Sequence, residues 1–351
     1  MSALDARAVG EVDRSDQTAD VLDLGNQLRD ALWRVESARL EPRDTPGGLI
    51  VAGVGGSAVG GMLARAALGD RASRPIAIVR DYALPPWATP DTTVLCASYS
   101  GKTEEALACF DAAGVLGARR IVVTTGGPLA DLAREEVVPV IPMPAGIAPR
   151  SAVAYLTVAA LEVAALCGAA PGVRSEVDVA AAYAEELAAE WGPDGAQDGL
   201  AKALARALHG SAPVVIGAGL TAPVAYRWKT QVNENAEQPC HAGCLPELCH
   251  NEIAGWSGAR DVGRYTAVFL SDPDLHPRVR ERIELTRRLI EPHAVGTHLI
   301  EGHGESRIAR VTSLVLLGDL VSIYMAVLRG VDPAPVAVLD ELKSALGASR
   351  V

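Results

Sequence analysis

The feature that most constrains this chain is a regular alternation of short apolar runs with segments of helical spacing. In the first half, the apolar runs occupy residues 49–53, 76–79, 93–98, 121–124 and 137–141. Apolar runs of this length are typical of strands buried on both faces, and parallel strands need a helical crossover between them. The pattern predicts an α/β fold in which helices cover both faces of a parallel sheet.

The helical segments of the first half follow the same alternation. Helices are expected at residues 20–40, 58–68, 104–116 and 129–133. A further stretch, residues 151–167, is apolar on nearly all sides, which predicts a helix buried against a large part of the protein.

The second half begins like the first, with an apolar strand at residues 213–217, a Gly-Ala-Gly turn and a helix at residues 222–237. Further strands are expected at residues 266–270 and 294–299, and further helices at residues 277–289, 307–328 and 335–346. This weak internal repeat indicates two sheet domains, for which 351 residues are sufficient.

The segment between the two halves differs in composition. Residues 169–199 are rich in Ala, Glu and Gly, and we interpret them as the connection between domains. The expected division is an N-terminal helical segment (1–46), a first domain (47–170), a connecting segment (171–200) and a second domain with a C-terminal helix (201–351).

Charge and hydropathy exclude several classes of function. The chain has 32 basic and 43 acidic residues, so its net charge of −11 disfavours a nucleic-acid partner. We expect no membrane partner, because no apolar run reaches the roughly 20 residues that span a bilayer. The polar start of the chain does not resemble a signal peptide, which predicts a soluble, cytoplasmic protein. The six cysteines are too sparse for a disulfide framework and are expected to be free.

A glycine-rich turn follows the first strand. Residues 53–57 have the sequence Gly-Val-Gly-Gly-Ser and open a helix, whose N-terminus favours an anion. A dinucleotide site is an alternative, with Asp81 as the ribose ligand, although Asp81 lies 28 residues after Gly53 where about 20 are expected. A tight turn without a ligand is a second alternative.

A hydroxyl-rich loop follows the strand at residues 93–98. Residues 98–105 have the sequence Ser-Tyr-Ser-Gly-Lys-Thr-Glu-Glu, which gathers hydroxyl and backbone N–H groups where a strand leads into a helix. Such groups bind a phosphate without a net positive charge. Helix capping by Thr103 is an alternative, whereas a nucleotide P-loop would require a glycine at Cys96.

Two polar clusters lie in the second half. Glu234 stands between two asparagines in the helix at residues 222–237, as expected of a carboxylate that acts as a general base, although a solvated helix face is equally compatible. His250, next to an asparagine and a glutamate, adds a group that titrates near neutral pH.

A zinc site is an alternative use of this region. Its candidate ligands are Cys240, His241, Cys244, Cys249 and His250. Their spacing is not that of a standard zinc motif, and we expect neither a metal nor another cofactor.

Taken in order, five motifs resemble the bifunctional phosphoglucose/phosphomannose isomerases. They are Gly-x-Gly-Gly-Ser, Ser-Tyr-Ser-Gly-x-Thr-Glu-Glu, Ala-Pro-Arg, Asn-Glu-Asn-Ala and Pro-Glu-Leu-x-His-Asn-Glu-Ile. The resemblance spans roughly residues 47–346. It implies two sugar-isomerase (SIS) domains, each a flavodoxin-like parallel sheet between helices, and a homodimer whose subunits share their active sites.

The resemblance also implies roles for individual residues. Glu234 would be the base, His250 would open the sugar ring, Arg150 would stabilise the enediolate and Lys343 would complete the site. The phosphate of a phosphorylated hexose would be held by Gly56, Ser57, Ser98, Ser100 and Thr103.

The chain departs from the family at three places. Lys102 stands where the family usually has Asn, and Glu237 stands where it has Lys, which would place a like charge one helical turn from Glu234. The family also tends to have a threonine near the start of the last helix, and residues 333–338 contain none, which leaves use of the mannose epimer open.

The leading hypothesis is an aldose–ketose isomerase that interconverts glucose 6-phosphate and fructose 6-phosphate through an enediolate, with mannose 6-phosphate as an open second substrate. The first alternative is a sugar-phosphate-binding SIS protein without catalysis. The second is a nicotinamide-dependent oxidoreductase, which depends only on the glycine turn and Asp81.

Overall fold

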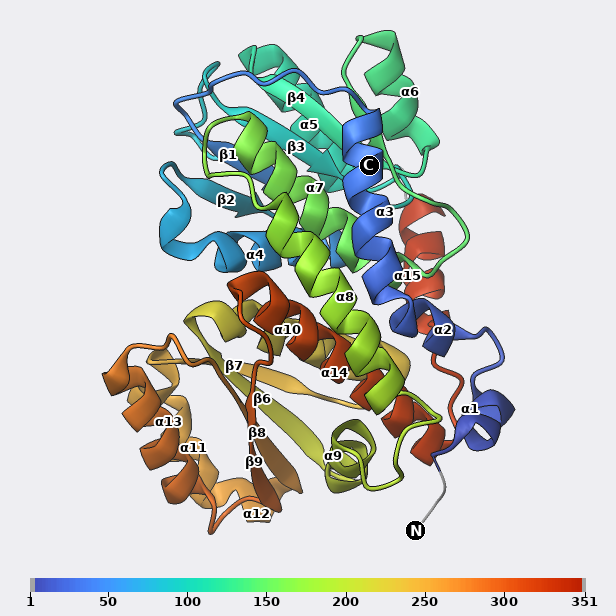
Figure 1. Ribbon diagram of the computed structural model, residues 1–351, viewed down its shortest axis with the longest axis vertical. Coiled ribbons are helices and arrows are strands. Elements are labelled where there is room, and N and C mark those ends of the chain that lie inside the picture. Colours follow the sequence, from blue (N-terminus) through green and yellow to red (C-terminus); the bar gives the residue numbers. More distant parts are fainter. Residues whose placement is uncertain (1–3, 349–351) are drawn as a thin grey trace.

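The structure is a computed structural model that describes residues 4–348, apart from the side chains of residues 343, 347 and 348. Two sheets lie one above the other, and long helices run between and alongside them (Figure 1). The predicted α/β class is confirmed.

The first sheet contains five parallel strands in the order β2-β1-β3-β4-β5. They are β1 (Leu49–Ala52), β2 (Ile76–Val79), β3 (Thr93–Ala97), β4 (Arg119–Thr124) and β5 (Val140–Pro142). This order is that of flavodoxin-like sheets, in which ligands bind at the carboxyl edge beside the first strand. Ala52 pairs with Cys96, so β1 and β3 end side by side at that edge.

Helices cover both faces of the first sheet, as predicted. They are α4 (Gly56–Leu68), α5 (Glu104–Leu116), α6 (Gly127–Glu135) and α7 (Val153–Leu166), with short 3₁₀ turns at η1 (Gly69–Arg71) and η2 (Pro149–Ala152). α7 is almost wholly buried and packs closely on α4. A Cβ at Gly60 of α4 would lie 2.5 Å from Cβ of Leu156, so glycine allows this approach.

The N-terminal segment departs from the single helix expected at residues 20–40. It forms α1 (Ala6–Val12), α2 (Gln17–Leu22) and α3 (Leu24–Ser37). The buried carboxylate of Asp13 accepts hydrogen bonds from the backbone N–H groups of Gln17 and Thr18 at 2.9 and 2.7 Å, which fixes the start of α2. Asp23 then separates α2 from α3.

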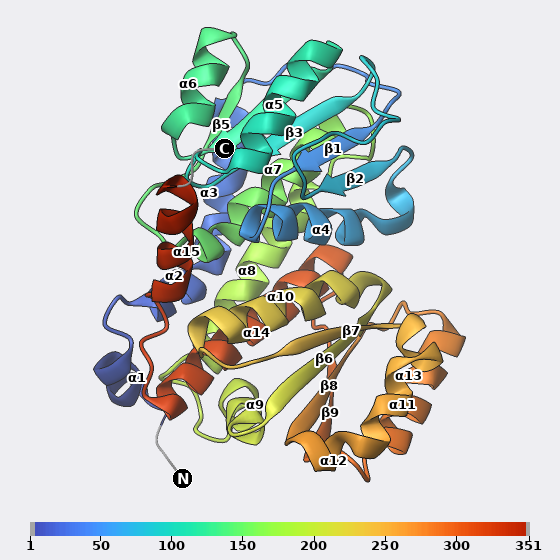
Figure 2. The same ribbon diagram turned by 180° about the vertical axis from the view of Figure 1, so that it is seen from behind.

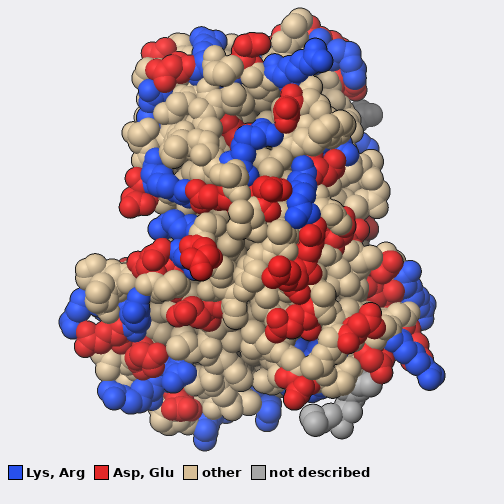
Figure 3. All heavy atoms as spheres, in the orientation of Figure 1, with Lys and Arg blue, Asp and Glu red and all other residues tan. Residues whose placement is uncertain are grey.

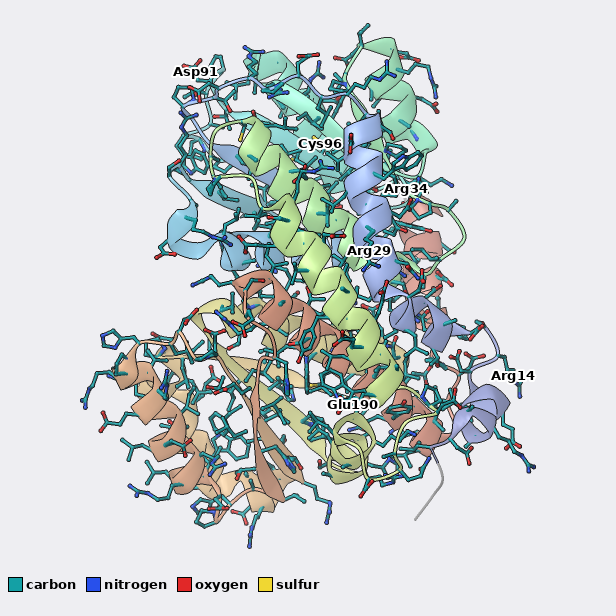
Figure 4. The ribbon with its side chains drawn as sticks, viewed as in Figure 1. Arg14, Arg29, Arg34, Asp91, Cys96 and Glu190 are labelled. Atoms are coloured by element: carbon teal, nitrogen blue, oxygen red, sulfur yellow. The ribbon has the colours of Figure 1, made fainter. Side chains whose placement is uncertain are left out.

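The segment expected to connect the domains contains an 18-residue helix, α8 (Arg174–Trp191). It lies against α3 and α14 (Arg307–Arg329) and passes alongside both halves of the molecule (Figures 1 and 2). Arg29 of α3, labelled in Figure 4, forms ion pairs with Asp178 and Glu185 of α8. α8 is therefore a packed part of the structure. A second unexpected helix, α9 (Leu200–Leu208), follows it.

The second sheet contains four parallel strands in the order β7-β6-β8-β9. They are β6 (Ala212–Ala218), β7 (His241–Leu245), β8 (Tyr265–Ser271) and β9 (Gly296–Glu301). This order repeats that of β2, β1, β3 and β4 in the first sheet, so β8 corresponds to β3. The edge strand β7 was not predicted.

The helices of the second half include two that lie between the sheets (Figure 2). These are α10 (Ala222–Asn235) and the long, buried α14. The others are η3 (Gly219–Thr221), η4 (Glu247–His250), α11 (Glu252–Gly255), η5 (Trp256–Gly258), α12 (Ala259–Val262), α13 (Pro277–Ile290) and α15 (Ala337–Ala348).

By length and composition alone, two segments could cross a membrane, contrary to the expectation from the sequence. Pro149–Leu166 has a mean hydropathy of 1.2, and Arg307–Arg329 has a mean hydropathy of 2.0 over 23 residues. In the folded chain, 78% and 89% of their apolar windows are buried. Both segments are core helices, and their apolar character is satisfied by packing inside the protein.

Charged side chains are mixed on the face shown in Figure 3. Lys and Arg side chains lie among Asp and Glu side chains there, without a continuous basic stripe. That face therefore lacks the electrostatic surface that binds a polyanion.

All six cysteines are free, as expected from the sequence. Burial raises the pKa of the Cys109 thiol to about 11 and that of the Cys240 thiol to about 12. We expect a maleimide at pH 7.5 to modify Cys244 first and Cys249 more slowly, because Cys244 is exposed, Cys249 is half-buried and the other four are buried. Burial also raises the pKa of the Cys244 thiol, so its reaction should be slower than that of a free thiol. Mass spectrometry with and without denaturant checks this order, and rapid native labelling of Cys96 would contradict it.

Candidate active site

The turn after β1 brings the backbone close to the end of β3. A Cβ at Gly53 would lie 2.5 Å from the carbonyl oxygen of Ala97, and Gly55 has a φ of +58°. Glycine is thus required at Gly53 for close approach and favoured at Gly55 for its left-handed backbone. α4 starts at Gly56, and Ser57 is buried in its first turn. This helix N-terminus faces the carboxyl edge of the sheet, where an anion is stabilised.

The hydroxyl-rich loop follows β3 directly after Cys96 and Ala97; Cys96 is labelled in Figure 4. The hydroxyl groups of Ser98 and Thr103 lie 2.7 Å apart, and Ser100 Oγ accepts from the backbone N–H of Lys102 at 3.2 Å. Thr103 precedes α5, but its side chain makes no capping hydrogen bond. The hydroxyl groups of Ser98 and Thr103 therefore face each other, and helix capping does not explain Thr103.

Gly101 determines the shape of this loop. Its φ is +65°, and a Cβ there would lie 1.8 Å from the backbone carbonyl oxygen of Gly126. We expect Gly101→Ala to raise KM for a sugar phosphate at least about 10-fold and to destabilise the protein by about 1–3 kcal/mol, because backbone atoms must move. Gly117→Ala is the matched control, since Gly117 also has a positive φ (+74°) but has open space around it. Steady-state kinetics and thermal unfolding of both variants distinguish distortion of the loop from backbone strain alone.

The segment that precedes α7 lies against this loop. Tyr99 donates its hydroxyl proton to the carbonyl oxygen of Ile147 at 2.8 Å. From the N-terminal segment, Gln17 donates to the hydroxyl of Ser151, and Asp20 accepts from the N–H of Ala148 at 3.4 Å. Burial raises the pKa of the Asp20 carboxyl. Two parts of the chain, the hydroxyl-rich loop and α2, thus hold the segment on both sides of Arg150.

Arg150 lies between α4 beside the first sheet and α10 beside the second. A Cβ at Gly56 would lie 3.8 Å from Cα of Arg150, and Arg150 Nη1 lies 3.8 Å from Glu234 Oε2 on α10. Arg150 Nη2 donates to the carbonyl oxygens of Pro333 and Ala334, the latter at 2.9 Å. The Arg150 side chain is 8% exposed and that of Glu234 is 32% exposed. Burial lowers the pKa of the Arg150 guanidinium, and the charge of Glu234 opposes that shift.

The structure therefore brings most of the predicted site residues together. Ser57 and Ser98 lie at adjacent strand ends, Gly56 contacts the segment of Arg150, and Arg150 contacts Glu234. A partly exposed carboxylate next to a buried cation can exchange a proton with a ligand whose negative charge the cation stabilises.

His250 is not part of this arrangement within one chain. It is exposed in η4, which is anchored by the buried Leu248. Within residues 4–348, no hydrogen bond or ion pair joins His250 to Arg150 or Glu234. Lys343 belongs to α15, but its side chain lies outside the described part of the structure.

The prediction that Glu237 lies in the same helix as Glu234, one turn further on, is wrong. α10 ends at Asn235, and Glu237 is exposed with a left-handed backbone (φ +46°). The two carboxylates therefore do not stand one helical turn apart. Lys102, the other change of sign, is exposed at the hydroxyl-rich loop.

The loop after β8 corresponds to the hydroxyl-rich loop of the first sheet but has different chemistry. It carries Asp272 and Asp274, and both carboxylates bind the guanidinium of Arg310 on α14. Arg310 Nε lies 2.7 Å from Asp272 Oδ2, and both side chains are buried. Carboxylates repel a phosphate, so this loop is unsuited to binding one.

The zinc alternative finds no geometric support among the described residues. No group of three or more His, Cys, Asp or Glu side chains there could hold a metal ion. Cys240, just before the strand β7 (His241–Leu245), is buried, whereas Cys244 within this strand is exposed. The two thiols therefore lie in different surroundings.

Two residues were missed by the sequence analysis. Arg227 of α10 and Asp319 of α14 form a buried ion pair with distances of 3.0 and 2.6 Å, and Arg227 Nη2 also donates to the carbonyl oxygen of Arg150 at 3.1 Å. The signal was present: Asp319 is a single acid within a long apolar run, and a buried charge requires a partner.

Parallel sheets of flavodoxin-like order, with hydroxyl groups at one strand end and a cation–carboxylate pair beside them, define the class of SIS-domain proteins. Residues 197–346 match the family described as "Bacterial phospho-glucose isomerase C-terminal SIS domain". The chain belongs to the family of bifunctional phosphoglucose/phosphomannose isomerases, as its motifs indicate. It is 36% identical over 301 residues to the member from Caldicellulosiruptor bescii, covering 85% of this chain and 89% of that protein.

Further comparisons agree with this assignment. The bifunctional phosphoglucose/phosphomannose isomerase of Aquifex aeolicus is 33% identical over 300 residues, covering 85% of this chain and 90% of that protein. Among solved structures, a hypothetical protein from Thermus thermophilus superposes with a TM-score of 0.72 at 16% identity, covering 98% of this chain and 93% of that chain. The structural likeness supports the fold.

Proposed function

We propose that this protein is an aldose–ketose isomerase that interconverts glucose 6-phosphate and fructose 6-phosphate and also accepts mannose 6-phosphate. The relatives named for both activities support the substrates. The single observation that carries the mechanism is the 3.8 Å contact between Arg150 and Glu234 beside the hydroxyl-rich loop. The substrate is a phosphorylated hexose.

The phosphate is held where the two loops of the first sheet meet. Hydroxyl groups of Ser57, Ser98, Ser100 and Thr103 donate to its oxygens, and the backbone at Gly56 approaches closely. The N-termini of α4 and α5 add the partial positive charge of their unpaired N–H groups. This site requires no net positive charge, in agreement with the acidic composition.

Glu234 acts as the base. Its carboxylate removes the proton from C2 of the open-chain aldose and returns it to C1 on the same face, while a proton moves between the two oxygens. The intermediate is an enediolate with negative charge on an oxygen that was a carbonyl. Arg150 stabilises this charge more than it stabilises the neutral carbonyl, which lowers the barrier.

Ring opening requires a second proton-transfer group, and we assign it to His250. Because His250 is exposed and makes no contact with the Arg150–Glu234 pair within the described part of one chain, we propose a homodimer in which His250 enters the site of the other subunit. Lys343 of α15 completes the site.

Two broader expectations accompany this function. We propose that the enzyme works in the cytoplasm, since the relatives carry the names of sugar-phosphate isomerases.

We also propose the division into an N-terminal segment (1–46), two SIS domains (47–170 and 201–351) and the connecting segment between them. The family match begins at residue 197, close to the second domain boundary.

The mannose epimer is expected to fit. The backbone of Ala334 lies at the site, because its carbonyl oxygen accepts a hydrogen bond from Arg150. Its side chain is a single methyl group, which leaves room beside a bound sugar. We expect kcat/KM for mannose 6-phosphate within about 10-fold of that for glucose 6-phosphate, and Ala334→Leu to lower the mannose value selectively.

A coupled assay of fructose 6-phosphate formation from each aldose phosphate tests the proposed function. Turnover with glucose 6-phosphate is the expected result. Tight binding of the sugar phosphates without turnover would instead identify a non-catalytic SIS protein. A rise in melting temperature with a nicotinamide dinucleotide, and none with a sugar phosphate, would favour the oxidoreductase.

A further inference from the structure

The ion pair between Arg227 and Asp319 is among the most deeply buried in the described chain. The two side chains are 2% and 4% exposed. The contact is bidentate: Arg227 Nε donates to Asp319 Oδ1 at 3.0 Å, and Nη2 donates to Oδ2 at 2.6 Å. Burial raises the pKa of the Asp319 carboxyl, and the charge of Arg227 opposes that shift.

Stability alone does not explain such a pair. Taking two charges out of water costs about as much as their attraction returns, so apolar side chains of similar size would stabilise the helix contact at least as well. A buried ion pair does fix geometry, because its hydrogen bonds have defined directions. The role of this pair is therefore indicated by the residues that it contacts.

Arg227 connects the ion pair to the active site. Its Nη2 also donates to the carbonyl oxygen of Arg150 at 3.1 Å. Arg227 and Glu234 are seven residues apart on α10, which places them on the same face of the helix, two turns apart. One helix thus holds the backbone of Arg150 at one point and presents a carboxylate to its guanidinium at another.

Further bonds hold α10 against α14. Asn235, next to Glu234, donates to Ser322 Oγ at 2.8 Å, and Ser322 in turn donates to the carbonyl oxygen of Asp319 at 2.7 Å. Trp228 donates to the carbonyl oxygen of Leu314 at 2.7 Å. These hydrogen bonds fix both the rotation of α10 about its own axis and its position along α14.

Charge is balanced in the same place. Arg227 and Arg150 are two buried cations whose repulsion Asp319 offsets, and the Glu234 carboxylate lies 3.8 Å from the Arg150 guanidinium. Without Asp319, the charge of Arg227 would act unopposed on the segment of Arg150.

We infer that Arg227 and Asp319 are positioning residues, which set the distance and direction between the Arg150 guanidinium and the Glu234 carboxylate. This inference rests on the proposed isomerase function. Neither residue touches the substrate. They act on the chemical step by fixing the distance and direction between the base and the cation beside the reacting carbon atoms, where small displacements reduce the rate strongly.

Asp319→Asn tests the inference, with Asp272→Asn as its matched control. Asp272 pairs with Arg310 on the same helix, is equally buried and lies outside the Arg150–Glu234 contact. We expect Asp319→Asn to lower kcat about 30-fold or more with KM changed less than 3-fold, and Asp272→Asn to keep kcat within 3-fold of wild type. Circular dichroism at the assay temperature verifies that both variants are folded.

Arg227→Lys provides an independent variant, because lysine keeps the charge opposite Asp319 but cannot also reach the carbonyl oxygen of Arg150. We expect it to lower kcat by a similar factor with little change in melting temperature. Equal kcat values for Arg227→Lys, Asp272→Asn and wild type would overturn the inference, whatever the stability of Asp319→Asn.

Binding measurements separate this inference from the proposed function. A five-carbon phosphorylated hydroxamate mimics the enediolate, whereas sorbitol 6-phosphate offers the phosphate without a carbonyl. By calorimetry, we expect Arg227→Lys to weaken hydroxamate binding at least about 10-fold and to leave sorbitol 6-phosphate binding unchanged. A wild-type protein that neither turns over glucose 6-phosphate nor prefers the hydroxamate would refute the proposed function itself. If the wild type turns over glucose 6-phosphate and prefers the hydroxamate, and Arg227→Lys keeps the same preference for the hydroxamate over sorbitol 6-phosphate, only the positioning role is refuted.

Discussion

Replacing Glu234 by glutamine is expected to lower kcat for glucose 6-phosphate by about 10³-fold, the loss typical of removing a general base. Glutamine has nearly the same shape but cannot accept the proton from C2. KM is expected to change less than 5-fold, because the loops proposed to hold the phosphate belong to the other sheet. Exchange of the C2 proton with deuterated water, followed by NMR, measures the proton-transfer step directly and should fall by the same factor.

Glu237→Gln is the matched control for this substitution. Glu237 lies close in sequence but is exposed beyond the end of α10. We expect its kcat within 3-fold of wild type. If Glu237→Gln lost activity and Glu234→Gln kept it, the base would be assigned to the wrong carboxylate.

The largest expected effect on stability is that of Trp228→Ala. Trp228 is fully buried between α10 and α14, and a Cβ at Gly318 would lie 2.1 Å from its indole nitrogen, so the ring fills the space above that glycine. Truncation removes this contact and the hydrogen bond to Leu314. We expect a loss of about 3–5 kcal/mol in the free energy of unfolding and a melting temperature lower by roughly 10 °C.

Trp33→Ala serves as the comparison, since Trp33 on α3 is 61% exposed. Its truncation is expected to change the free energy of unfolding by less than about 0.5 kcal/mol. Denaturation followed by circular dichroism measures both variants without depending on tryptophan fluorescence. Similar midpoints for the two would show that the α10–α14 contact contributes little to stability.

Local sequence patterns were sufficient for most of the first sheet. β2 and α5 have the predicted bounds, because an apolar run and an acidic first turn mark them clearly. β7 could not be predicted in the same way. His241–Leu245 contain Gly, Cys and an exposed His, and this edge strand exists because its backbone pairs with Val214–Ala218 of β6. Pairing between distant segments is not encoded in the pattern of either one.

α8 shows a second limit of prediction. Its sequence is rich in Ala and Glu, which suits both a solvated linker and a helix with a narrow apolar face. Only the contacts with α3 and α14 distinguish the two, and they come from segments on either side of it in the chain. The start of α2 at Gln17, ahead of the helix expected from residue 20, likewise depends on the buried carboxylate of Asp13, four residues before α2.

In the candidate site, too, some features follow from neighbouring residues in the sequence, whereas others depend on contacts between distant segments. The two turns proposed to hold the phosphate could be predicted as turns, because each is one strand–turn–helix unit with its hydroxyl groups close together in sequence. The contact of Arg150 with Glu234 could not be predicted from spacing, since it depends on how two sheets pack. The hydrogen bonds from Arg150 to Pro333 and Ala334 depend on a third segment, which the sequence places near the C-terminus.

The acidic loop after β8 has a consequence for stoichiometry. Two similar sheets suggest two equivalent ligand sites, as in many products of gene duplication. The hydroxyl-rich loop follows β3 in the first sheet, whereas after β8 the carboxylates of Asp272 and Asp274 share a single guanidinium, that of Arg310. Calorimetric titration should therefore find one hexose phosphate bound per polypeptide. We therefore expect the first sheet to anchor the ligand and the second to supply the base, so that two similar sheets together form one catalytic site.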